Sequence, residues 1–273
     1  MSERNLFEKK LARHGPVLTA SISAIVRACQ DVFREDLHCV VLCGSLLKED
    51  FVPNYSDADI HVYVADTVLE KGGCLKLDYA VRFQEAIGHL SPRDAGVSQF
   101  QVSFFSSQKE SDWNPLIAGT FVILYGTEVP TMRMPPLSDY LDGERRELSR
   151  VRDVRLALLR RFADKSDVSA LGVLRLTGTE LKGFLYALCA VITENPEKTF
   201  KSPLDTVLNR VSVIPGLSHA RSFFEAARDW KKIETETERM REVFVFGMKA
   251  LEAIERWQRK EEVEKAERST EEE

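Results

Sequence analysis

VVLCGSLLKEDFVPNYSDADIHVYV, residues 40–64, is the stretch that decides the fold of the first half of this chain. It begins with an apolar run, continues with the Gly-Ser pair at 44–45, and after eleven further residues reaches the acidic triplet 57–59 and a second apolar run. A nearly continuous apolar run is typical of a buried strand, and alternation is typical of a strand with one polar face. The stretch therefore predicts strand, glycine turn, short helix, loop and strand.

Two carboxylates at the start of the second strand point in the same direction. Successive side chains of a strand alternate between its faces, so Asp57, Asp59, His61 and Tyr63 share one face and the apolar residues share the other. Carboxylate oxygens suit Mg²⁺ or Mn²⁺ better than zinc. Asp57 and Asp59 are thus the predicted metal ligands and catalytic residues, and the alternative is that they only end a turn.

The Gly-Ser turn that precedes them is suited to phosphate. Gly44 lets the backbone turn tightly, and the first free N–H groups of the short helix attract an anion. The Ser45 hydroxyl adds a donor, and Lys48 adds a cation one helical turn later. We therefore predict that Gly44, Ser45 and Lys48 bind the phosphates of a nucleotide. The alternatives are a helix cap for Ser45 and a surface position for Lys48.

The segments around this stretch alternate between the two kinds of secondary structure. Apolar residues at helical spacing predict helices, and period-two alternation predicts strands. In the first half of the chain we expect helices over 17–36, 75–90 and 112–118, and strands over 38–43, 57–64, 97–105 and 121–125.

A proline-rich segment, VPTMRMPPL at 129–137, marks a change of character. Beyond it long helical patterns dominate, and they predict a helical bundle. The expected helices are 138–163, 168–194, 203–212, 217–231 and 235–267. The fold class is therefore α+β, with an α/β domain over 1–132, a helical bundle over 133–260 and a charged flexible tail over 261–273.

Composition excludes several classes of protein. The 273 residues carry a formal net charge of −5 and are 44% hydrophobic, so a core can be buried and a general duplex-binding surface is not expected. There is no apolar run long enough to span a membrane, and the first residues are charged rather than apolar. The five cysteines lack metal-site spacing. We expect a cytoplasmic protein with reduced thiols and no membrane partner.

The spacing of these motifs resembles that of a known family. Gly44-Ser45, eleven residues and then Asp57-Ala58-Asp59-Ile60 is similar to the signature of the DNA polymerase beta-like nucleotidyltransferase superfamily. The segment 44–50, GSLLKED, resembles the GSxARG motif of the minimal and aminoglycoside nucleotidyltransferases. The segment 121–129, FVILYGTEV, resembles the strand and turn that end the core of these enzymes. A helical C-terminal domain also occurs in the kanamycin-type enzymes.

This resemblance implies a chemistry and a substrate. It implies a magnesium-dependent nucleotidyltransferase that binds a nucleoside triphosphate, with ATP as the expected one, transfers the nucleoside monophosphate and releases pyrophosphate. Mg²⁺ or Mn²⁺ would be held by Asp57 and Asp59, and the phosphates by Gly44, Ser45 and Lys48. The acceptor is a small molecule, a protein or an RNA end, and the sequence does not decide among them. Whether the chain forms a homo-oligomer is also left open.

One position departs from the pattern of the family. The family supplies a third carboxylate from a later strand, and the matching strand here carries Gln101. An amide cannot take a proton near neutral pH. Either the base comes from elsewhere, with His61 as an auxiliary candidate, or the acceptor brings its own, or the chain binds nucleotide without efficient turnover. The alternative function is therefore a nucleotide-binding regulatory or antitoxin-like protein, and a purely structural α/β protein is a third interpretation.

Overall fold

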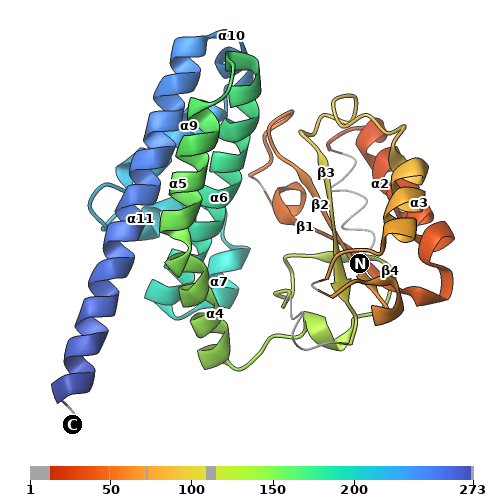
Figure 1. The fold of residues 1–273 in the computed structure, drawn as a ribbon, viewed down its shortest axis with the longest axis horizontal. Helices are drawn as coiled ribbons and strands as arrows, with labels where there is room; N and C mark the ends of the chain where they lie inside the picture. The colour runs from red at the N-terminus through yellow and green to blue at the C-terminus, as the bar shows by residue number, and fades with distance from the viewer. Residues whose placement is uncertain (1–12, 49, 72, 109–114, 272–273) are drawn as a thin grey trace. The chain divides into compact units, whose positions relative to one another are not determined.

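The computed structural model describes residues 13–48, 50–71, 73–108 and 115–271 (Figure 1). The chain forms two compact units, Met1–Pro135 and Pro136–Glu273. The division lies within the proline-rich segment, close to the predicted boundary between residues 132 and 133. The first unit holds a small mixed sheet with helices and the second is helical, so the predicted α+β class is confirmed.

The first unit is built on a four-stranded sheet with the order β3-β2-β1-β4. β1 is antiparallel to both of its neighbours, whereas β2 and β3 run parallel. Each strand corresponds to one of the alternating or apolar segments of the sequence. Their bounds are β1 Leu37–Cys43, β2 Ala58–Val64, β3 Phe100–Ser106 and β4 Val122–Gly126.

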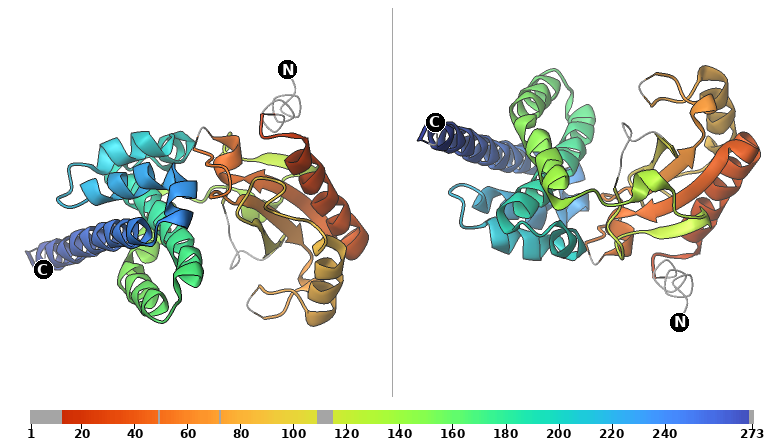
Figure 2. Two further views of the ribbon diagram at one scale, coloured as in Figure 1. Left: turned by 90° about the horizontal axis from the view of Figure 1, so that it is seen from above. Right: turned by 90° about the horizontal axis from the view of Figure 1, so that it is seen from below.

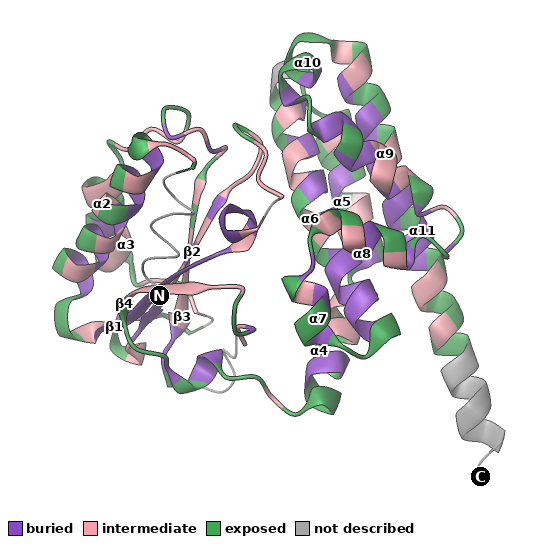
Figure 3. Ribbon diagram, turned by 180° about the vertical axis from the view of Figure 1, so that it is seen from behind, coloured by how far each residue is buried: buried purple, intermediate pink, exposed green. Residues whose placement is uncertain are grey.

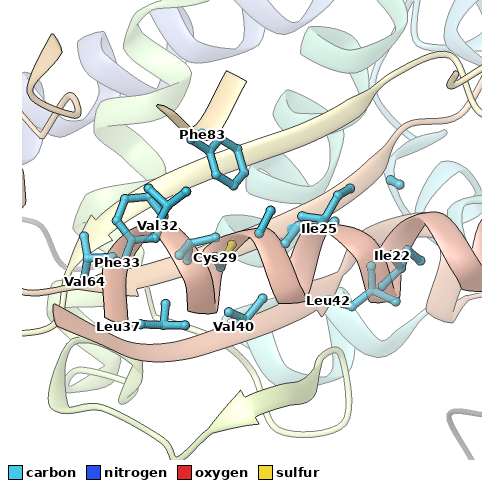
Figure 4. Close-up of a cluster of buried hydrophobic side chains, with 14 of the residues drawn as sticks. Ile22, Ile25, Cys29, Val32, Phe33, Leu37, Val40, Leu42, Val64 and Phe83 are labelled. Atoms are coloured by element: carbon cyan, nitrogen blue, oxygen red, sulfur yellow. The ribbon is translucent and has the colours of Figure 1, made fainter. Parts of the chain in front are cut away.

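Two helices, α2 (Pro16–Phe33) and α3 (Leu77–Ile87), cover one face of this sheet (Figure 2). The side chains that join α2 to the sheet recur at helical spacing, from Leu18 to Phe33, and all of them are buried. Figure 4 shows them lying over the apolar face of β1, with Phe83 of α3 closing the cluster. Short 3₁₀ turns complete the layer at Arg34–Asp36, Gly44–Leu47 (η2) and Asp66–Val68.

The opposite face of the sheet is covered near its centre by the segment that follows β4. Cys39, Val41 and Tyr63 are fully buried there and pack with Val129, which precedes the 3₁₀ turn Pro130–Met132, and with Met132, which ends it. Tyr63 does lie on the face that it was predicted to share with the aspartates. That face is polar only at the start of β2, because residues 116–132 bury its other end.

The second unit consists of helices that pack mainly on two long ones. α11 packs against α5, α6 and α9, and α6 also packs against α4, α7 and α8. Figure 3 shows buried residues along the inner sides of these helices. The bounds are α4 Leu137–Ser149, α5 Val151–Ala163, α6 Asp167–Thr193, α7 Pro196–Lys201, α8 Leu204–Val211, α9 Ser218–Ala227, α10 Trp230–Thr235 and α11 Thr237–Glu271.

A buried carboxylate ties α5 to α11. Glu255 is 4% exposed and accepts a hydrogen bond from Arg155 at 2.9 Å. Arg259, one turn further along α11, donates to the other carboxylate oxygen. The burial of this charge is tolerated because two guanidinium groups neutralise it.

Several predicted elements differ from those observed. The helix expected over 138–163 is divided at Arg150 into α4 and α5, although neither proline nor glycine stands there. The one expected over 217–231 is likewise divided into α9 and α10. The short helix expected over 112–118 falls partly outside the described residues, and residues 115–118 are not helical. α7 was not predicted, although Asn195 caps it by accepting a hydrogen bond from the Lys198 N–H at 2.9 Å.

The C-terminal segment is a further difference. Residues 261–273 were expected to form a charged flexible tail, yet α11 continues to Glu271. Gln258 donates a hydrogen bond to Glu262, one turn further along α11. Such a pair of polar side chains stabilises this part of the helix. The absence of glycine and proline after Gly247 also favours the long helix. Residues 272–273 lie outside the described part.

Candidate functional site

The predicted site residues meet where β1 ends and where β2 and β3 begin. η2 follows β1 directly and carries Gly44 and Ser45, and Asp57 precedes β2 by one residue. In the antiparallel pairing of β1 with β2, Cys43 lies opposite Asp59. In the parallel pairing of β2 with β3, Asp59 lies beside Gln101. Residues separated by up to 57 positions therefore share one end of the sheet.

Gly44 and Asp59 are in direct contact. A Cβ atom added to Gly44 would fall on the Oδ2 atom of Asp59 and would lie 2.9 Å from its Cγ atom. Gly44 also has a φ of +79°, a left-handed conformation that residues with a side chain rarely adopt. The glycine is thus required twice, by the turn and by the carboxylate that rests against its Cα atom.

Asp57 is held by two side chains from the segment that leads into β3. The Ser98 hydroxyl donates to Oδ1 of Asp57, and the Gln99 amide nitrogen donates to Oδ2 at 3.2 Å. The contact of Gln99 with Asp57 was not predicted. Ser98 was missed entirely, because only the register of two strands that are distant in sequence reveals it.

Gln101 occupies the position beside Asp59 at which a third carboxylate was sought. Its side chain is exposed, and its Oε1 atom accepts a hydrogen bond from the Gln99 amide nitrogen at 3.4 Å. With this oxygen facing Gln99, the remaining polar atom of Gln101 is a donor. This end of the sheet therefore combines two carboxylates with two amides.

Ser45 and Lys48 occupy the turn next to the carboxylates. Ser45 is 7% exposed. Lys48 is half-buried. Burial and the charge of Asp59 raise the pKa of the Cys43 thiol, whereas the charge of Lys48 lowers it. Both charges consequently act on the same end of β1.

His61 lies one step further along the same face of β2. Its ring packs against Phe105 with 5.0 Å between the ring centroids, and burial lowers its pKa to about 4. The imidazole is therefore neutral at neutral pH, and it is a weak base because its conjugate acid is strong. The low pKa therefore argues against His61 as the main group that takes the proton of the acceptor.

The donor set can accommodate a magnesium ion. Magnesium is bound by one or two carboxylates, and water and phosphate oxygens complete its shell. Asp57 and Asp59 provide that number, one immediately before β2 and one within it. In the described ranges, there is no cluster of three or more His, Cys, Asp or Glu side chains arranged for a metal ion.

Among the helices of the described residues, none has the length and apolar character needed to cross a membrane.

No protein-family model matches the chain, and a search of curated proteins finds no match. The site is therefore interpreted from its own geometry.

Proposed function

We propose that this chain transfers a nucleoside monophosphate from a nucleoside triphosphate, with ATP as the expected donor, to an acceptor and releases pyrophosphate in a magnesium-dependent reaction. The observation that carries the proposal is the contact of the Asp59 carboxylate with the Cα atom of Gly44, with Asp57 immediately before the same strand. In this proposal the contact brings a cation-binding carboxylate against a phosphate-binding turn. The resemblance to the polymerase beta-like nucleotidyltransferases supports the same assignment.

Each residue has a separate role in this proposal. Asp57 and Asp59 hold Mg²⁺ or Mn²⁺, which neutralises charge on the triphosphate and fixes its orientation. The backbone N–H groups after Gly44 and the Ser45 hydroxyl bind the β- and γ-phosphates. Lys48 adds a positive charge at the same place. Rate acceleration then comes from alignment and charge compensation rather than from a covalent intermediate.

The reaction is a displacement at the α-phosphorus. An acceptor hydroxyl oxygen forms a bond to this atom while the bond to the bridging α–β oxygen breaks, and that oxygen leaves with pyrophosphate. The proton of the acceptor goes to water or to a base that the acceptor carries. Gln101 cannot receive it, because an amide is not basic near neutral pH.

A second candidate function is favoured by Gln101 alone. A site with two carboxylates and an amide can bind nucleotide and cation without efficient turnover, as a regulatory or antitoxin-like protein would. In that case the bound nucleotide changes the stability or the interactions of the chain, and no bond of the triphosphate is broken.

The two functions are separated by following ATP with Mg²⁺ or Mn²⁺. The transferase forms AMP-containing product and pyrophosphate, and the double substitution Asp57→Asn with Asp59→Asn abolishes both. The matched control is Asp31→Asn with Asp78→Asn, which removes the same charge from exposed positions on α2 and α3. Nucleotide binding without pyrophosphate release supports the regulatory function, and formation of ADP contradicts cleavage at the α-phosphorus.

A further inference from the structure

Both carboxylate oxygens of Asp57 accept a hydrogen bond from the segment that leads into β3. The Ser98 hydroxyl donates to Oδ1, and Nε2 of Gln99 donates to Oδ2 at 3.2 Å. A carboxylate has about four lone-pair positions. Each of these two bonds takes one position, so the bonds themselves leave about two of the four for a cation.

The backbone on either side of these contacts is fixed as well. The Ser98 N–H donates to the Ser56 carbonyl at 3.0 Å, and the Ala58 N–H donates to the Gln99 carbonyl at 3.0 Å. These two bonds flank Asp57 and extend the pairing of β2 with β3 beyond the strands. The donor side chains are therefore held in register with the carboxylate that they contact.

Gln99 also reaches the second half of the site. The same Nε2 atom that donates to Asp57 donates to Oε1 of Gln101 at 3.4 Å, and Gln101 is the strand neighbour of Asp59. One amide group thus connects the surroundings of both carboxylates. Gln99 is exposed, so burial in a core does not account for its place.

We infer that Ser98 and Gln99 are positioning residues of the cation site, which fix the rotation of the Asp57 carboxylate so that its open lone pairs face a divalent cation. This inference rests on the proposed function, because that function assigns the cation to Asp57 and Asp59. Hydrogen-bond partners behind a metal ligand orient it, and their loss weakens metal binding by about 10- to 100-fold.

The test is a titration of the full chain with Mn²⁺, followed by electron paramagnetic resonance of the free ion. Ser98→Ala and Gln99→Leu are each expected to weaken Mn²⁺ binding by about 10- to 100-fold. Ser98→Thr keeps the hydroxyl and is expected to retain the affinity. The matched controls are Ser23→Ala and Gln84→Leu, at exposed positions on α2 and α3, and they are expected to bind Mn²⁺ like the unmodified chain.

Thermal unfolding without metal separates positioning from a structural role. Positioning predicts that the variants unfold near the temperature of the unmodified chain and gain less stability from Mn²⁺. If Ser98→Ala and Gln99→Leu instead lower the unfolding temperature and keep the full Mn²⁺ affinity, the inference is wrong while the proposed function stands. If the unmodified chain binds no Mn²⁺ with or without ATP, the proposed function itself is wrong, and the inference is wrong with it.

Discussion

Replacement of Gly44 by alanine removes the feature on which the candidate site depends most. The added methyl group would fall on Oδ2 of Asp59 and would lie 2.9 Å from Cγ, whereas ordinary contacts begin near 3.4 Å. The carboxylate must therefore move by roughly 1 Å, and a misplacement of about that size costs about 100-fold in the function of a site. We expect Gly44→Ala to lower the rate of pyrophosphate release by about two orders of magnitude and to weaken the binding of Mn²⁺ with ATP.

Backbone strain must be separated from this displacement. Gly44 has a φ of +79°, so alanine there also costs about 1–2 kcal/mol of folding stability. Gly73 has a φ of +82°, and a Cβ added to it would meet no atom within 4 Å. Gly73→Ala is therefore the matched control, because it introduces similar strain without a clash. Both variants are expected to unfold roughly 2–8 °C below the unmodified chain.

Isothermal titration with Mn²⁺ and ATP distinguishes the two variants. Gly73→Ala is expected to keep the affinity of the unmodified chain, whereas Gly44→Ala is expected to lose most of it. If Gly44→Ala binds as tightly as Gly73→Ala, the carboxylate of Asp59 is not needed at its observed place and the reasoning is refuted.

Two further predictions concern stability. Burial lowers the pKa of His61 from 6.5 to about 4, so between these pH values the unfolded chain binds a proton that the folded chain does not. The free energy of unfolding should thus fall by up to about 3 kcal/mol as the pH is lowered from about 6.5 to 4. His61→Asn should flatten this dependence in urea titrations, and an unchanged slope would contradict it. In the helical unit, a Cβ added to Gly247 would lie 2.6 Å from Cγ2 of Thr177, so Gly247→Ala should cost about 1–3 kcal/mol. Gly172→Ala in α6 meets no neighbour and should stabilise by about 0.5–1 kcal/mol, and equal effects of the two would refute the packing argument.

The part of the site formed by the Gly44 turn and the two aspartates could be predicted from the sequence, because the sequence signals for it are local. A glycine turn after an apolar run and two aspartates two residues apart depend only on neighbouring positions, and these predicted the strand–turn–strand unit correctly. The candidate position of Gln101 also followed from alternation along one strand. Its pairing with Asp59 is observed in the structure, and its part in chemistry stays a prediction.

The surroundings of Asp57 could not be predicted in the same way. Ser98 and Gln99 reach it from 41 and 42 residues further along the chain, across a parallel strand pair whose register no local pattern specifies. The burial of Tyr63 depends likewise on residues 116–132, which cover that face. The break at Arg150 has no sequence signal, because neither glycine nor proline marks it.

In the proposed site, Asp57 and Asp59 hold a divalent cation against the triphosphate bound by the Gly44 turn. A crystal structure with Mn²⁺ and an ATP analogue that cannot be cleaved between the α- and β-phosphates would test this arrangement. We expect an anomalous Mn²⁺ peak in contact with oxygens of both aspartates and of the analogue, with the β- and γ-phosphates at Ser45. An analogue bound elsewhere, or a Mn²⁺ peak that neither aspartate contacts, would contradict it.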